Sequence, residues 1–151
     1  MGSNMKKKKA GREYIGVGGG ILIFNKKGEV LLMKRGKNSS NEVGWWTQPG
    51  GAIEFGEKAI NGLKREIKEE LDIKINIWGY APHVDHIIKR EKQHWVAIIF
   101  LANLKSGTPK IMEPHKCDEI KWFNLKKLPK NLTQSTREPI ENYLKGKYIK
   151  L

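Results

Sequence analysis

The chain has 151 residues and a formal net charge of +13 at pH 7, because 29 Lys and Arg residues outnumber 16 Asp and Glu residues. This length suits one domain with its own hydrophobic core, and the single cysteine, Cys117, excludes an internal disulfide framework and indicates a reducing compartment. No apolar run approaches the roughly 20 residues of a membrane helix, and no apolar segment of signal-peptide length follows Lys6–Lys9. We therefore expect a cytoplasmic protein without a membrane partner.

The first 14 residues are expected to lie outside the folded domain. Met1–Asn4 looks like a remnant of an expression vector, and the lysine run that follows is typical of a frayed terminus. We expect residues 1–14 to be disordered and residues 15–151 to form a single domain.

The positive charge is spread along the chain. Such a surface attracts nucleotides, nucleic acids or acidic lipids, and no RNP-like or helix-turn-helix pattern organises it. We interpret this positive charge primarily as a surface that keeps the protein soluble. Steering of a small phosphate-bearing substrate is the second interpretation, and nucleic-acid binding is the third.

Taken in chain order, the first predicted elements are the two strands of a hairpin. The glycine-rich run Ile15–Asn25 ends in apolar residues, Lys26–Gly28 forms the turn, and Glu29–Lys34 is the second strand. Gly36–Gly51 is expected to be a loop. In Glu57–Leu71 the apolar residues recur at helical spacing, which predicts a helix.

Three strands and a closing helix follow. The expected strands are Ile73–Trp78, His94–Leu104 and Glu119–Phe123. Thr136–Leu144 is expected to be a helix with Pro139 near its first turn. This order of strands and helices predicts an α+β or mixed α/β fold in one domain.

Three glutamates beside the apolar stripe of the first predicted helix are the first candidates for chemistry. Glu66, Glu69 and Glu70 lie at positions i, i+3 and i+4, so their side chains are neighbours at the edge of the buried face. Like charges at this spacing repel one another and raise their pKa values, and a divalent cation removes the repulsion. Carboxylate oxygens suit Mg²⁺, with Mn²⁺ as the alternative. Taken alone, however, such a pattern is more often a solvated helix face.

The residues around these glutamates form a recognisable motif. In order, the chain carries Gly51, Glu57, Arg65-Glu66-Ile67, Glu69-Glu70 and Asp72-Ile73. Their order and spacing resemble the Nudix box, the signature of the Nudix hydrolases. Only Asp72 departs from the box, which has glycine at this position. That glycine caps the helix in the left-handed conformation, and Asp tolerates this conformation better than most residues. The resemblance implies a mixed β-sheet sandwiched between α-helices, and an enzyme that cleaves phosphoanhydride bonds in nucleotides.

The resemblance also assigns roles to individual residues. The implied metal ligands are Gly51, Glu66, Glu69 and Glu70. Arg65 completes the catalytic set, and it is expected to form an ion pair with Glu57 that fixes the preceding loop against the helix. The box does not fix the general base, which stays open among Glu69, Glu113 and Glu119.

Further segments resemble the MutT-like nucleoside triphosphate diphosphatases. These segments are Gly16–Gly20, Gln48–Glu57, His94–Val96 and Glu113–Cys117. They imply hydrolysis of a (deoxy)nucleoside triphosphate, oxidised or modified for some members, to the monophosphate and pyrophosphate. The residues expected at the substrate are Gly50, Gly51, Arg35, His94 and Trp95, although Trp95 fits the hydrophobic core equally well.

Two other functions stay open. One is hydrolysis of another nucleoside diphosphate derivative, such as ADP-ribose or capped RNA. The other belongs to a different class, a basic RNA-binding module on the same fold, although a pure binder has no need of the carboxylates. Dimers are common among the proteins that the chain resembles, so a homodimer is open as well.

Overall fold

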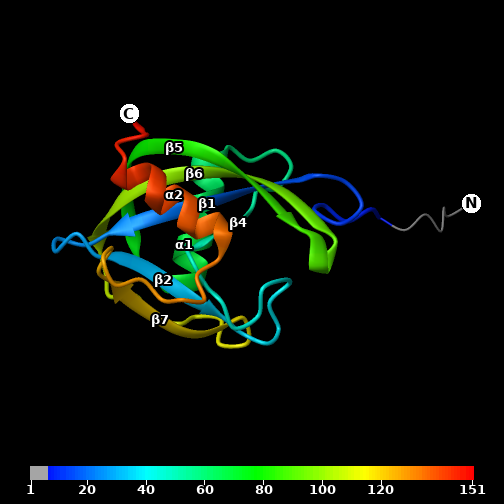
Figure 1. Cartoon of the computed structure of the whole chain (residues 1–151), viewed down its shortest axis with the longest axis horizontal. Helices are drawn as coiled ribbons and strands as arrows, with labels where there is room; N and C mark the ends of the chain where they lie inside the picture. Colours follow the sequence, from blue (N-terminus) through cyan, green and yellow to red (C-terminus); the bar gives the residue numbers. More distant parts are fainter. Residues whose placement is uncertain (1–6) are drawn as a thin grey trace, which may run out of the picture.

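The computed structural model describes residues 7–151, so the expectations for the vector-derived residues and for the rest of residues 1–6 lie outside the described part. One mixed sheet has the strand order β3-β2-β1-β6-β5-β8, with β4 pairing with β1 and β7 with β2 beside this path (Figure 1). The strands are β1 (Gly16–Phe24), β2 (Val30–Arg35), β3 (Trp46–Thr47), β4 (Gly50–Ala52), β5 (Lys74–Ile88), β6 (Gln93–Ser106), β7 (Cys117–Phe123) and β8 (Ile149–Lys150). The helices are α1 (Ala59–Leu71), the short 3₁₀ helix η1 (Lys89–Glu91) and α2 (Gln134–Leu144).

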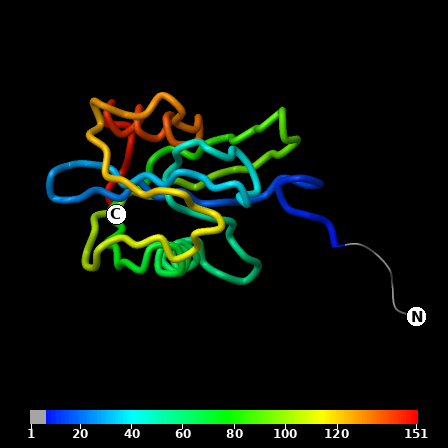
Figure 2. The backbone as a smooth tube through the Cα atoms, turned by 90° about the horizontal axis from the view of Figure 1, so that it is seen from below, coloured from blue at the N-terminus to red at the C-terminus, as the bar shows by residue number. Residues whose placement is uncertain are grey.

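The two longer helices cover opposite faces of the sheet (Figure 2). Leu63 and Ile67 of α1 pack with Ile21 on one face, and Ile140 of α2 packs with Leu22 on the other. This arrangement confirms the expected sheet between helices. Within residues 7–151, no helix combines the length and the apolar character that crossing a membrane requires.

The glycines of β1 let α1 approach the sheet closely. A Cβ atom on Gly19 would lie 2.6 Å from both methyl groups of Leu63, which is fully buried. Any side chain at this position would therefore push the helix outward. The glycine-rich strand thus sets the position of α1, and α1 carries the box glutamates.

The C-terminus of α1 confirms the expectation for the residue that departs from the Nudix box. Asp72 has φ 53° and ψ 45°, a left-handed conformation, and its N–H donates to the Lys68 carbonyl at 3.0 Å. The helix begins at Ala59, two residues after the start that the sequence pattern predicts. Asp72 therefore ends the helix with the cap geometry that glycine usually provides.

The β5–β6 hairpin is longer than predicted. The expected strand stopped at Trp78, whereas β5 continues to Ile88, and the hairpin projects beyond the rest of the sheet in Figure 1. The pairing register shifts near Gly79 and again between Ala81 and Val84. Bulges of this kind accommodate Gly79 and Pro82, the residues that interrupt the strand pattern in the sequence.

The predicted place of Pro139 near the first turn of α2 is wrong. The helix begins at Gln134, so Pro139 lies in its interior. A proline there removes the hydrogen bond to the carbonyl four residues earlier, which belongs to Ser135. The Gln48 side-chain amide donates to that carbonyl at 2.8 Å, and this bond joins α2 to the segment between β3 and β4.

A short turn precedes β1 within the segment that was expected to be disordered. The Gly11 N–H donates to the Tyr14 carbonyl at 2.7 Å, and the His94 N–H donates to the Gly11 carbonyl at 2.8 Å. The Trp95 ring packs on Gly11 so closely that a Cβ atom there would lie 2.2 Å from it. Residues 10–14 are therefore attached to β6.

Candidate active site

Two adjoining cavities lie beside β4. The acidic cavity, of about 350 Å³, is lined by Glu66 and Glu70 of α1 and by Glu113 of the loop after β6. The tryptophan cavity, of about 220 Å³, is lined by Trp95 and Ala97 of β6. The residues that line both cavities are Arg35, Ser40, Thr47, Gln48, Gly50, Gly51 and Ala52. One ligand with a charged end and a ring can therefore occupy both cavities.

The loop after β6 brings Glu113 to the C-terminal turn of α1. The Lys110 N–H donates to the Leu71 carbonyl at 3.0 Å, and the Met112 N–H donates to the Glu70 carbonyl at 3.1 Å. The last carbonyl groups of a helix have no partner within the helix, so the end of α1 anchors this loop. Glu113 consequently lines the same cavity as Glu70.

Glu70 is held in an unfavourable environment for a negative charge. Burial, and then the neighbouring carboxyl groups of Glu66 and Glu113, raise the pKa of Glu70 to about 9, although Arg35 acts in the opposite direction. At neutral pH and without a cation, Glu70 therefore keeps its proton. A cation between these carboxyl groups would stabilise the ionised form.

The donors in the acidic cavity fit a magnesium ion. A Cβ atom on Gly51 would lie 2.8 Å from Cδ of Glu66, so the Gly51 backbone lies against that carboxyl group. In residues 7–151, no three Asp, Glu, His or Cys side chains converge into a complete metal cage. Mg²⁺ takes one or two protein carboxylates and completes its shell with water and substrate phosphates, and Glu66 and Glu70 provide that set.

Arg65 and Glu57 form the ion pair that the sequence predicts. Arg65 Nη2 donates to Glu57 Oε1 at 3.0 Å, and Nε donates to Oε2 at 3.3 Å. Arg65 Nη1 also contacts Glu69 Oε2 at 3.3 Å, and 55% of the Glu69 side chain is exposed. Glu69 lines neither cavity, so the structure brings Glu66 and Glu70 together and leaves Glu69 beside Arg65.

Arg35 lies between the two cavities. Its Nε donates to the Asn41 carbonyl at 2.7 Å. Burial lowers the pKa of Arg35, and the negative charges of Glu42 and Glu70 oppose that effect. Arg35 therefore contributes a cationic side chain to the wall that the two cavities share.

Trp95 lines the tryptophan cavity, and His94 does not. The Trp95 ring covers Gly16, where a Cβ atom would lie 2.4 Å from it, and its Nε1–H donates to Gln93 Oε1 at 2.9 Å. Consecutive side chains of a strand point to opposite faces, and His94 lines neither cavity. Of the other predicted residues, Glu119 of β7 also lies outside both cavities.

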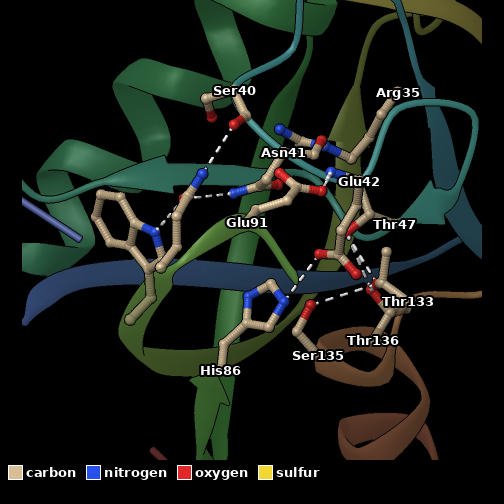
Figure 3. A network of polar contacts seen from close by, with 12 residues as sticks. Arg35, Ser40, Asn41, Glu42, Thr47, His86, Glu91, Thr133, Ser135 and Thr136 are labelled. Atoms are coloured by element: carbon tan, nitrogen blue, oxygen red, sulfur yellow. Dashed lines mark hydrogen bonds and ion pairs between the residues drawn. The ribbon is translucent and has the colours of Figure 1, made fainter. Parts of the chain in front are cut away.

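A polar network joins the β5–β6 hairpin to the loop between β2 and β3 (Figure 3). Gln93 is at its centre, because Nε2 donates to the Ser40 carbonyl at 2.8 Å and Oε1 accepts from Asn41 Nδ2 at 3.0 Å. No motif in the sequence signals these contacts, since each joins segments far apart in the chain. The site residues that sequence reasoning missed are Glu42, Thr47, Gln48, His86, Gln93, Ser135 and Thr136.

Comparison with known proteins identifies this arrangement. The model of the NUDIX domain matches residues 15–143, so the chain belongs to the NUDIX family. It is 30% identical over 132 residues to the ADP-ribose pyrophosphatase of Methanocaldococcus jannaschii, covering 83% of this chain and 71% of that protein. It is 34% identical over 101 residues to the RNA pyrophosphohydrolase of Ruthia magnifica, covering 56% of this chain and 54% of that protein.

Two further similar proteins are a relative that is much longer than this chain and a protein of known structure. The 8-oxo-dGDP phosphatase NUDT18 of Danio rerio is 33% identical over 91 residues, which cover 60% of this chain and only 26% of that protein. The crystal structure of a MutT NUDIX hydrolase from Burkholderia pseudomallei is 38% identical and superposes with a TM-score of 0.79, covering 85% of this chain and 98% of that one. The chain is therefore a MutT-like member of the NUDIX family, and its relatives include proteins named ADP-ribose pyrophosphatase and RNA pyrophosphohydrolase.

Proposed function

We propose that the chain is a magnesium-dependent diphosphatase that converts a (deoxy)nucleoside triphosphate, normal or oxidised, into the monophosphate and pyrophosphate. The observation that carries this proposal is the position of Glu66, Glu70 and Glu113 in one cavity that opens, past Arg35, into a second cavity lined by Trp95. The acidic cavity suits the metal-bound phosphate chain, and the tryptophan cavity suits the nucleoside. An aromatic ring at that place offers a face for stacking on a base.

The acidic residues of the acidic cavity, together with Gly51 and Arg35, have separate roles in this reaction. Glu66 and Glu70 would hold a magnesium ion beside Gly51, where the ion would supply Lewis-acid polarisation of the phosphate oxygens. Glu113 takes a proton from the attacking water as general base. The water oxygen forms a new bond to phosphorus, the phosphoanhydride bond breaks, and pyrophosphate leaves with the bonding electron pair. Arg35 neutralises charge on the phosphate chain.

The outer residues of the box support this arrangement. Arg65 holds Glu57 on the loop that leads from β4 into α1, and this keeps Gly51 against Glu66. Glu69 lies on the outer side of Arg65 and completes that ion-pair cluster. We assign Arg65 and Glu69 to the positioning of the metal ligands.

The experiment is pyrophosphate release from a panel of normal and oxidised nucleoside triphosphates with Mg²⁺, with and without EDTA. Wild type is compared with Glu70→Gln and with Glu141→Gln, a matched carboxyl-to-amide change at an exposed position of α2 outside both cavities. We expect release by wild type and Glu141→Gln, and loss of release with EDTA or in Glu70→Gln. Absence of release from every triphosphate would contradict the proposal.

A second candidate substrate is the 5′ phosphate chain of an RNA, free or capped. Among residues 7–151, Lys68 and Lys116 are the only lysines in ion pairs with carboxylates, so most of the positive charge is available to a long polyanion. The RNA pyrophosphohydrolase among the relatives supports this alternative. Pyrophosphate release from 5′-triphosphorylated RNA, faster than from free nucleotides, would favour it. RNA binding that falls steeply with salt, without turnover, would favour a binding module instead.

A further inference from the structure

A third hollow lies outside the two cavities of the candidate active site. It has a volume of about 340 Å³ and lies between the turn before β1 and the tip of the β5–β6 hairpin, which meet at one end of the molecule (Figure 1). The charged and aromatic side chains in its wall are Arg12, Glu13, Tyr14, Lys89, Lys92 and His94. We call this site the hairpin hollow. No residue of the Nudix box lines it, and the proposed hydrolysis assigns no role to its wall.

The positive charge of the hairpin hollow has no partner in the protein. Arg12, Lys89 and Lys92 are exposed, and among residues 7–151 no carboxylate forms an ion pair with any of them. Glu13 is the one carboxylate in the wall, and its Oε1 accepts the Lys9 N–H at 3.2 Å. Three cations against one carboxylate attract an anion.

Lys92 is held in a conformation that glycine adopts more readily. It follows η1 with φ 53° and ψ 49°, in the left-handed region, and its N–H donates to the Lys89 carbonyl at 3.2 Å. A residue with a side chain is strained there, whereas glycine is not. The lysine therefore costs stability at the tip of the hairpin, which points to a use for its charge.

Tyr14 gives the hairpin hollow an aromatic wall. Its side chain is 53% exposed, and the neighbouring Ile87 is 54% exposed. An exposed ring beside cations is the combination that binds single-stranded nucleic acid, because a base stacks on the ring while phosphates lie against the cations. A lipid surface instead takes up apolar side chains that project from a protein, whereas these side chains line a hollow. The shape and the charge therefore favour a polynucleotide.

The two walls of the hairpin hollow are fixed to each other and to the active site. The His94 N–H donates to the Gly11 carbonyl at 2.8 Å, and Arg12 Nη2 donates to the Ser40 carbonyl at 3.1 Å. Gly11 also packs against the ring of Trp95, which lines the tryptophan cavity. A site whose walls are already in place loses less entropy when it binds a ligand.

We propose that the hairpin hollow binds single-stranded nucleic acid, with a base against Tyr14 and the phosphate backbone against Arg12, Lys89 and Lys92. This inference goes beyond the proposed function, because the site lies outside both cavities and its binding needs no hydrolysis. Stacking on an aromatic ring tolerates any base, so the hollow holds a strand without reading its sequence.

The first test measures binding of an oligouridylate RNA by fluorescence anisotropy in EDTA. The strand has about 12 nucleotides and a 5′-hydroxyl end, so it offers no phosphoanhydride bond and the result does not depend on hydrolysis. The charge variant replaces the three cations of the hollow, Arg12→Gln, Lys89→Gln and Lys92→Gln. The charge control has the same net charge and replaces three exposed lysines after β7 that line neither the hollow nor the cavities, Lys126→Gln, Lys127→Gln and Lys130→Gln.

The charge variant and the charge control are expected to differ. The charge variant should bind about 10-fold or more weakly at low salt, and its plot of log K against log salt should be flatter by about 2, because each lost cation removes a phosphate contact. The charge control should stay within about 3-fold of wild type. Equal weakening of both would mean that net charge alone holds the strand, and it would overturn the proposal, as would absence of binding by wild type.

The second test concerns the ring of Tyr14. Tyr14→Ala removes the stacking surface, and we expect it to weaken binding by about 5-fold or more without a change in the salt dependence, since no charge is lost. Tyr14→Phe keeps the ring and should bind like wild type. Unchanged binding in Tyr14→Ala, or equal weakening in both variants, would overturn the stacking role.

The third test separates binding from stability at Lys92. Lys92→Gly removes the charge and relieves the left-handed backbone, so we expect a Tm equal to or above that of wild type together with weaker RNA binding. Unchanged RNA binding in this variant would contradict the use of Lys92.

Vesicles of phosphatidylcholine and phosphatidylserine test the other polyanion, an acidic lipid surface. We expect the charge variant and the charge control to sediment equally with them. Vesicle binding that only the charge variant loses, without RNA binding by wild type, would assign the hairpin hollow to a lipid surface and overturn the proposal.

Discussion

Arg65 holds both carboxylate oxygens of Glu57, through Nη2 at 3.0 Å and Nε at 3.3 Å. The two residues are brought together because Glu57 ends the loop after β4 and Arg65 lies two turns into α1. Glu57 Oε1 also accepts the Glu54 N–H at 2.8 Å, so the pair closes the loop on itself. A fixed loop keeps the Gly51 backbone beside Glu66, so we expect a displacement of this loop to lower activity.

The first prediction concerns the pH dependence of this pair. The hydrogen bond from Arg65, and then the Glu54 N–H, lower the pKa of Glu57. The pair therefore contributes stability above the pKa that Glu57 has in the unfolded chain, and this contribution is lost as the pH falls through the lower, folded value. We expect Glu57→Gln to lower the Tm at about pH 7 and to lower it less at about pH 3, because the contribution of the pair diminishes as the pH falls toward the lowered pKa of folded Glu57. Equal loss of Tm at both values would contradict a charge-dependent role.

The second prediction concerns Glu70 without metal. Its pKa is raised to about 9 in the folded chain, so the folded state holds this proton more tightly than the unfolded state does. The corresponding stability is complete below the ordinary glutamate pKa and is lost as the pH rises toward 9. In EDTA, we expect the Tm of wild type to fall from pH 5 to pH 9 by more than that of Glu70→Gln. Differential scanning fluorimetry tests this, and parallel curves would refute it.

Magnesium should reverse that pattern. At about pH 8, added Mg²⁺ is expected to raise the Tm of wild type, because a ligand that binds only the folded state stabilises it. Glu70→Gln should respond much less, whereas the exposed control Glu141→Gln should respond like wild type. An equal response of all three chains would mean that the ion binds elsewhere.

The fourth prediction identifies the general base. Loss of a general base typically lowers kcat by about 10²–10⁴-fold, and we expect this loss for Glu113→Gln. Glu119→Gln should change kcat by less than about 3-fold, because that side chain lies outside both cavities. Steady-state kinetics at saturating Mg²⁺ separate the candidates. A larger loss in Glu69→Gln than in Glu113→Gln would transfer the role to Glu69.

The fifth prediction concerns the helix cap. Asp72→Gly removes the side chain from a residue in the left-handed conformation, which glycine adopts more readily than other residues. We expect this substitution to raise the Tm by about 2–4 °C. Asp72→Asn is the matched control, because Asn tolerates the same conformation but gives up the ion pair with Lys68. Activity should be unchanged in both variants. A lower Tm in Asp72→Gly than in Asp72→Asn would contradict the cap argument.

Much of the fold follows from short-range patterns. The helical spacing of Leu63 and Ile67 predicts α1, and both side chains are fully buried. The β1–β2 hairpin follows from the turn at Gly28. The continuation of β5 past Trp78 does not follow, because Gly79 and Pro82 interrupt the strand pattern and only pairing with β6 keeps the strand together.

The candidate site likewise contains contacts that the sequence predicts and contacts that it does not predict. The Arg65–Glu57 pair follows from the box because both residues belong to one local motif. The Asn41–Gln93 hydrogen bond joins residues 52 positions apart, and nothing near either residue signals it. Helical spacing also does not predict whether the Glu69 side chain points toward Arg65 or into the acidic cavity.

The strand pairing at the centre of the sheet affects how the chain folds during its synthesis. β1 pairs in parallel with β6 along its whole length, from Gly16 with Trp95 to Phe24 with Asn103. During synthesis, β1 can therefore complete its pairing with β6 only after the chain has left the ribosome as far as Asn103. Until then, the edge of β1 that pairs with β6 is open, and the apolar residues of β1 lie beside that open edge. Contacts between such distant segments slow folding to about milliseconds or longer. We expect fragments that end before β6 to aggregate, and refolding of the full chain to be limited by the meeting of these two strands.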